Sequence, residues 1–167
     1  FTGFDALGIE FVGAAPDTAL CCGYPLYGAG HHQAFEEQAR RVASVFGRYR
    51  RIVVPSPCCE YTFRVLYPRF GIDVESKIVS ALELIAPLVE RSSAKPLKDR
   101  VAYHDSCFQG RHLGQYDLPR KILSSVLGKS PVELRLNRGD AMCCGAGAVW
   151  ERTSPGAASA AAFNLLD

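Results

Sequence analysis

The spacing of apolar residues alternates between the 3.6-residue period of helices and the short continuous runs of buried strands. The clearest helical pattern covers residues 31–50, where one face carries Phe35, Ala39, Val42, Ala43 and Phe46. Residues 51–56 follow as a short apolar run that is stopped by Pro55, which indicates a buried strand. This alternation of helix and strand continues along the chain.

The remaining elements follow from the same reading. Further strands are predicted at 9–13, 100–105 and 131–135, and further helices at 60–70, 80–90, 118–128 and 157–166. Pro119 suits the first turn of helix 118–128 and Gly128 its end, whereas Pro87 predicts a kink or break within helix 80–90. Residues 94–99 are the predicted linker. Strands that alternate with helices predict a parallel sheet and an α/β fold.

The triplet Cys-Cys-Gly occurs twice, at 21–23 and at 143–145. The offset between the triplets also separates strand 9–13 from strand 131–135, so each triplet follows a predicted strand at the same distance. We therefore expect two related Rossmann-like halves, 1–97 and 98–167, each a small parallel sheet flanked by helices. Ligands of such sheets bind beyond the carboxyl ends of the strands, where these cysteines would lie.

Cysteine usage is the most unusual property of the chain. Six of the seven cysteines stand in adjacent pairs: Cys21, Cys22, Cys58, Cys59, Cys143 and Cys144, with Cys107 alone. An odd count cannot pair fully, and the first residues resemble no secretory signal, so a reducing compartment is expected. Buried free thiols or a vicinal disulfide would be the plain alternatives, but neither explains a pairing that recurs.

Composition narrows the function classes. The chain is 48% apolar and 22% charged, as in ordinary globular proteins, and its net charge of +2 argues against a nucleic-acid partner. Its longest apolar stretch, 78–89, contains a glutamate and a proline and is too short to insert into a membrane. The expected location is cytoplasmic, with any membrane association made through a partner. No nucleotide-binding or hydrolase motif is present.

The cysteine pattern resembles a known family. The segments "ALCCGYPLYGAG", "AYHDSCFQGRHLGQYDLPRKIL" and "AMCCGAGAVW" are similar to the cysteine-rich CCG domain of heterodisulfide reductases, where it occurs in the B-type and D-type subunits. The same domain occurs in iron–sulfur subunits of glycolate oxidase and lactate-utilisation systems. The resemblance covers almost the whole chain, which looks like a window of a longer protein: the first half lacks its opening cysteine and the second its closing CxxC.

The resemblance implies which thiols hold a cofactor. Cys21, Cys22 and Cys59 match ligand positions in the first half, and Cys107, Cys143 and Cys144 match them in the second. Ser56 stands where a further cysteine is expected, and Cys58 is an extra thiol that could substitute for it as a metal ligand. Each half thus keeps three matched cysteines where the resemblance implies five. No catalytic residue is identified from the sequence.

The chemistry of the thiols agrees with an iron–sulfur cluster. The resemblance implies a four-iron cluster, which in the family also occurs in a non-cubane form. Such clusters take several soft thiolates from separate loops, and helices expected just after the "PCC" and "CCGAG" segments would add positive dipole ends. Zinc would use the same residues but needs only four ligands and no vicinal pair. Zinc therefore remains the alternative cofactor.

Other residues near the cysteines admit two interpretations each. His104 and Asp105 either tune a cluster or hydrogen-bond the loop backbone, and Arg111 and His112 either balance cluster charge or form a solvated face. His31 and His32 are expected to be exposed. Tyr24, Tyr27 and Trp150 are expected to pack beside the cysteine loops.

Together, the resemblance and the thiols predict an iron–sulfur redox domain of the heterodisulfide-reductase type, part of an oxidoreductase. It would pass electrons to or from a disulfide, a quinone or a flavoprotein, with a flavoprotein or ferredoxin-like module as partner. The alternative is a structural zinc-binding or metal-free interaction domain without redox activity.

Overall fold

The computed structural model describes residues 8, 10, 20–93, 95–147 and 149–166. The predicted strand at 9–13 lies outside the described residues. Up to residue 90 the chain forms, in order, α2 (Tyr24–Gly28), α3 (His32–Phe46), β1 (Ile52–Val54), α4 (Pro57–Tyr61), the π-helix η2 (Thr62–Leu66), α5 (Tyr67–Arg69), the 3-10 helix η3 (Glu75–Lys77), β2 (Ile78–Ser80) and α6 (Ala81–Glu90).

The second part of the chain repeats this alternation with shorter strands. It contains β3 (Ala102–Tyr103), the π-helix η4 (Phe108–His112), α7 (Asp117–Leu127), β4 (Val132–Glu133), the 3-10 helix η5 (Arg138–Asp140), α8 (Trp150–Thr153) and α9 (Pro155–Leu166). No helix among the described residues has the length and apolar character needed to cross a membrane.

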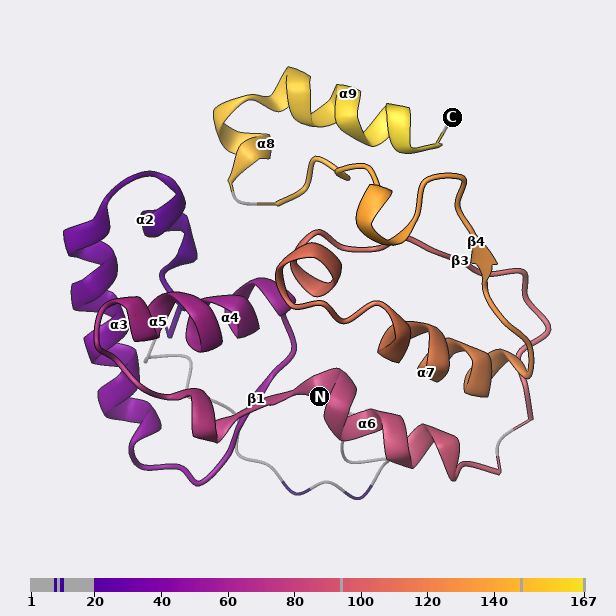
Figure 1. The fold of residues 1–167 in the computed structure, drawn as a ribbon, viewed down its shortest axis with the longest axis horizontal. Helices are drawn as coiled ribbons and strands as arrows, with labels where there is room; N and C mark the ends of the chain where they lie inside the picture. The colour runs from indigo at the N-terminus through magenta and orange to yellow at the C-terminus, as the bar shows by residue number, and fades with distance from the viewer. Residues whose placement is uncertain (1–7, 9, 11–19, 94, 148, 167) are drawn as a thin grey trace.

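The strands form two separate parallel pairs. In one, β1 lies beside β2 with Ile52 opposite Ile78, and in the other, β3 lies beside β4 with Ala102 opposite Val132. A helical crossover joins the two strands of each pair, as parallel pairing requires. The α/β class and the two small parallel sheets flanked by helices are therefore confirmed (Figure 1), whereas the division into 1–97 and 98–167 stays a prediction.

The main core lies between α3 and the α4–η2–α5 helix. The buried face of α3 carries Phe35, Ala39, Val42 and Phe46, as the periodicity predicted. It meets Leu66 and Tyr67, both fully buried, and the rings of Phe35 and Tyr67 stack edge to face with centroids 5.8 Å apart. This burial of aromatic and aliphatic surface anchors the loops on either side of the helices.

The segments before and after residue 97, called the first and second halves below, pack directly on one another. Helix α6 lies along α7, and α4 lies against η4 (Figure 1). Glu60, almost completely buried, accepts hydrogen bonds from Arg64 of its own half at 3.1 Å and from Gln115 of the second half at 3.2 Å. This contact fixes α4, which carries Cys58 and Cys59, against the second half.

One predicted helix boundary needs correction, the predicted break at Pro87 is absent, and one strand was not predicted. The helix predicted at 60–70 begins at Pro57, because proline at the first helical position needs no hydrogen-bond partner for its nitrogen. Cys58 and Cys59 therefore lie within the helix rather than before it. Helix α6 runs through Pro87 without a break and begins at a Ser80–Glu83 capping box. The short strand β2 was not predicted, since three residues are too few to show a period.

The core makes a simple prediction. Replacing Leu66 by alanine should lower the free energy of unfolding by about 2–5 kcal/mol, because the side chain is fully buried and leaves a cavity. Leu97→Ala removes the same atoms at a position that is 52% exposed and should change it by less than about 0.5 kcal/mol. Denaturant unfolding of both variants measures the difference, and equal losses would contradict the placement of the core.

Candidate functional site

Both Cys-Cys-Gly triplets adopt the same turn. Gly23 and Gly145 have φ of 85° and 76°, a left-handed conformation that glycine adopts without strain. In each turn the glycine N–H donates to the sulfur two residues earlier, Cys21 Sγ at 3.5 Å and Cys143 Sγ at 3.4 Å. The first cysteine of each pair is exposed, while the second is more covered. The repeat seen in the sequence is thus a repeat of local structure.

One group of thiols gathers in the first half. Cys22 precedes α2 and is 3% exposed, and the thiols of Cys58 and Cys59, in the first turn of α4, donate to its sulfur. These two hydrogen bonds lower the pKa of Cys22 to about 3, and they raise the pKa of both Cys58 and Cys59. Hydrogen bonds from neighbouring thiols therefore favour the thiolate form of Cys22 over that of its two partners.

Ser56 belongs to the edge of this group. It is the residue directly before α4. The hydrogen bond with Cys22 raises the pKa of Cys59, and the hydrogen bond between the Ser56 hydroxyl and Cys59 lowers that pKa by a smaller amount. The backbone of the Cys22 loop is held in turn by the hydroxyl of buried Tyr67, which donates to Cys22 O at 3.1 Å. Core packing therefore determines where these sulfurs lie.

A second group of thiols borders a cavity of about 600 Å³. Cys107 directly precedes η4, beyond the end of β3, and Cys143 and Cys144 follow β4 and η5. All three line the cavity, and so does Cys58 from the first half. Burial raises the pKa of Cys107, and the nearby thiol of Cys143 adds to the effect. The sequence prediction that these loops meet beyond adjacent parallel strands agrees with this arrangement.

His104 and Asp105, which precede Cys107, connect its loop to neighbouring segments. His104 Nε2 donates to Met142 O at 2.9 Å, directly beside the Cys143–Cys144 pair. The buried carboxylate of Asp105 accepts from the backbone N–H of Arg138 at 2.7 Å, which holds Arg138 at a left-handed φ of 53°. Of the two interpretations of His104 and Asp105, bonding to the loop backbone is what the structure shows.

Arg120 was not recognised in the sequence, yet it organises this region. Its guanidinium makes two 2.7 Å hydrogen bonds to Asp105 and two to Glu133, and it lies 5.1 Å from the ring centre of Tyr103. The Arg120 hydrogen bonds lower the pKa of both carboxyl groups. Because Asp105 follows β3 and Glu133 lies in β4, Arg120 ties α7 to both strands. The available signal was an arginine on the same helical face as the last leucine of "LPRKIL", three residues before Leu123.

The other residues singled out in the sequence have mostly structural roles. Arg111 donates to Ala141 O at 2.7 Å, and its charge acts on Cys107, lowering the pKa of that thiol. His112 is exposed but stacks on the rings of Tyr61 and Phe108. Tyr24 and Tyr27 pack against the core, and Trp150 lines the cavity with the cysteines.

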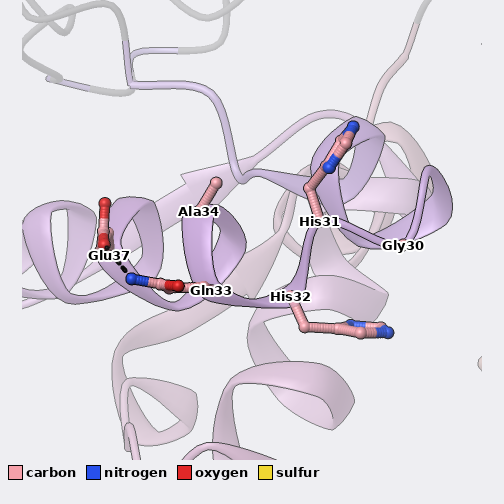
Figure 2. A pocket seen from close by; sticks show the side chains of 6 residues that line it. All are labelled: Gly30, His31, His32, Gln33, Ala34 and Glu37. Carbon is pink, nitrogen blue, oxygen red and sulfur yellow. Dashed lines mark hydrogen bonds between the residues drawn. The ribbon is translucent and has the colours of Figure 1, made fainter.

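His31 and His32 are exposed, as expected, in a separate hollow at the start of α3. Figure 2 shows their imidazoles pointing in different directions, with the Gln33 side chain bonded to Glu37 at 3.2 Å beside them. This hollow is lined by no cysteine, and its two imidazoles do not converge on one ligand position.

The spacing of the donors carries information about the cofactor. Within the described part of the chain, no three histidine, cysteine or acidic side chains come together tightly enough to hold a single metal ion. A tetrahedral zinc site would bring its sulfurs to about 3.8 Å from one another, given the length of a Zn–S bond. Four thiols spread around one cavity fit a larger, polynuclear group better.

The second Cys-Cys-Gly turn should tolerate no side chain. A Cβ at Gly145 would lie 2.2 Å from Ala158 O of α9, and the φ of 76° is itself unfavourable for alanine. Gly145→Ala should therefore cost at least about 2 kcal/mol of unfolding free energy and release α9. Gly156→Ala, in α9 with open space around it, should be neutral or slightly stabilising. Denaturant unfolding and hydrogen exchange of residues 155–166 would report both, and a silent Gly145→Ala would refute the contact.

Arg120 should contribute far more to the free energy of unfolding than an exposed arginine does. Arg120→Leu leaves the carboxylate of Asp105 buried without its partner and should cost about 3–5 kcal/mol. Arg40→Leu breaks the exposed pair with Glu36 and should cost about 0–1 kcal/mol. Denaturant unfolding measures both values, and similar losses in the two variants would show that Arg120 does not hold the strands.

Comparison with known proteins gives relatives among redox enzymes. "Probable iron-sulfur-binding oxidoreductase FadF" of Bacillus subtilis is 35% identical over 71% of this chain and 17% of its own length. The CoM/CoB fumarate reductase of Methanothermobacter marburgensis has a subunit, designated B, that is 33% identical over 79% of the chain and 26% of its own length. The dihydromethanophenazine:CoB--CoM heterodisulfide reductase of Methanosarcina barkeri has a subunit, designated D. This subunit is 27% identical over 84% of the chain and 36% of its own length.

The chain thus spans about a sixth to a third of the length of these three relatives. No solved structure matches it. The CCG family of cysteine-rich domains matches residues 4–64 and 101–166, two segments that contain both Cys-Cys-Gly turns and all seven cysteines. The chain belongs to the cysteine-rich CCG domain family.

Proposed function

We propose that this chain binds an iron–sulfur cluster and transfers electrons as a domain of a larger oxidoreductase. The observation that carries the proposal is the cavity of about 600 Å³ bordered by Cys58, Cys107, Cys143 and Cys144. The names of the relatives, an iron–sulfur-binding oxidoreductase and a heterodisulfide reductase among them, support the same chemistry.

The donor set suits this cofactor. Thiolates are the ligands that iron–sulfur clusters require, and here they come from separate loops and an adjacent helix. Cys107, Cys143 and Cys144 would hold the cluster in the second half, with Cys21, Cys22 and Cys59 as the matching thiols of the first. When bound, such a cluster supplies reversible one-electron transfer. The four-iron type, and whether it is a non-cubane form, belong to the proposal.

The residues of the chain have definite tasks in this proposal. The Gly145 N–H points at Cys143 Sγ and partly neutralises a charged sulfur, as the Gly23 N–H does at Cys21. The positive charge of Arg111 acts on Cys107. Phe108, which is buried, and Trp150 border the cavity and limit the access of water. These effects would tune the reduction potential through hydrogen bonding and dielectric.

The partner is proposed by class only. Relatives include "EtfAB:quinone oxidoreductase" of Syntrophomonas wolfei and components of a fumarate reductase and a heterodisulfide reductase. We therefore expect a flavoprotein or ferredoxin-like module to exchange electrons with this chain, and a disulfide or quinone to be the final acceptor or donor.

Anaerobic purification of the full-length protein tests the proposal. Iron and acid-labile sulfide should be present in nearly equal amounts, with a broad visible absorption that dithionite bleaches and air or ferricyanide restores. Zinc without sulfide would overturn the proposal in favour of a structural zinc domain. A fully reduced protein that binds neither metal after reconstitution with iron and sulfide would favour a metal-free interaction domain.

A further inference from the structure

The cavity that the cysteines border is built by both halves of the chain. Cys107, Cys143 and Cys144 come from the second half, but Ser56, Pro57 and Cys58 come from the segment that opens α4 in the first. The start of α4 reaches the cavity because α4 packs against η4, the helix that follows Cys107 (Figure 1). Packing between the two segments therefore adds Cys58 to a cavity that Cys107, Cys143 and Cys144 line from the described part of the second half.

Cys58 and its neighbour Cys59 face different surroundings. Consecutive residues of a helix point about 100° apart, so apart from their common partner Cys22 the two side chains meet different neighbours. Cys59 packs against the hydrophobic core and does not border the cavity, whereas Cys58 does. Cys22 is buried away from the cavity, although it accepts a hydrogen bond from Cys58.

Aromatic packing holds the start of the first helices against the second half. The ring of Tyr24 meets Phe108 edge to face, with centroids 5.1 Å apart, so this tyrosine spans the junction between the halves. Because Cys58 lines the cavity together with Cys107, Cys143 and Cys144, it is the thiol of the first half that meets the second group.

Given the proposed function, we propose that Cys58 is a protein ligand of the same cluster as Cys107, Cys143 and Cys144. A single cluster is then bound by thiolates of both halves. On binding, the S–H bond of Cys58 is replaced by a bond from sulfur to iron, and the proton passes to water. This differs from the sequence expectation, in which Cys58 replaces the ligand missing at Ser56 and serves the first half.

A ligand shared between the halves has a mechanical consequence. The cluster would join α4 directly to the loops beyond β3 and β4, in addition to the Glu60–Gln115 hydrogen bond between the halves. Loading of the cluster should therefore stabilise the junction between the halves, because a group that binds only the docked state shifts the equilibrium toward it.

Four serine variants test the assignment in the anaerobically purified full-length protein. Cys58→Ser, Cys107→Ser, Cys143→Ser and Cys144→Ser should lose the same share of iron and sulfide and change the same component of the electron paramagnetic resonance spectrum. Cys59→Ser, one residue away in the same helical turn but assigned to the first half, should leave that component intact and change only the iron and sulfide that Cys21→Ser also changes. If Cys58→Ser instead keeps the component that Cys107→Ser loses, the shared ligand set is wrong.

A labelling experiment avoids the question of whether a variant folds. In the wild-type protein under anaerobic conditions, Cys58 should resist iodoacetamide along with Cys107, and both should become labelled at least ten times faster after iron is removed by a chelator. Mass spectrometry of the peptides reads both sites. Labelling of Cys58 at an unchanged rate, with Cys107 newly exposed, would overturn the inference.

The two proposals fail in different ways. A wild-type protein that contains no sulfide refutes the iron–sulfur function itself. A wild-type protein with a normal cluster, in which Cys58→Ser behaves like Cys59→Ser, refutes only the role of Cys58.

Discussion

The cysteine loops of the second half depend on the hydrogen bonds that the buried guanidinium of Arg120 makes to Asp105 and Glu133. It reaches from α7 to Asp105, beyond β3, and to Glu133 in β4, and Asp105 in turn holds the backbone of Arg138. With strands of only two residues each, β3 and β4 have few backbone hydrogen bonds to fix their ends. The charge-assisted network supplies the rigidity that the short sheet lacks. The positions of Cys107 and Cys143 follow from it.

The repeated Cys-Cys-Gly turn shows how backbone conformation controls sulfur chemistry. A left-handed glycine lets the chain reverse so that its own N–H approaches the first sulfur of the pair. At Gly145 the same compactness lets α9 approach until Ala158 O leaves no room for a Cβ. Gly145 thus donates a hydrogen bond to the thiol, allows the turn and leaves room for the following helix to pack.

Packing between the halves brings the two cysteine groups together. The pairs α6–α7 and α4–η4, together with the buried Glu60, hold Cys58 between Cys22 on one side and the cavity on the other. The thiols of the two groups therefore meet across the junction of the halves.

The sequence by itself determined the class of fold, the helical face of α3, the position of α7 and the repeated cysteine turns. These depend on local rules, such as helical periodicity, Pro119 and Gly128 at helix ends, and glycine in left-handed turns. Only the tertiary structure decided that Arg120 joins the strands and that Cys58 borders one cavity with Cys107, Cys143 and Cys144. Those facts depend on contacts between residues far apart in the chain. A one-dimensional pattern records which residues are available for such contacts but not which of them meet, because that is set by how the helices pack.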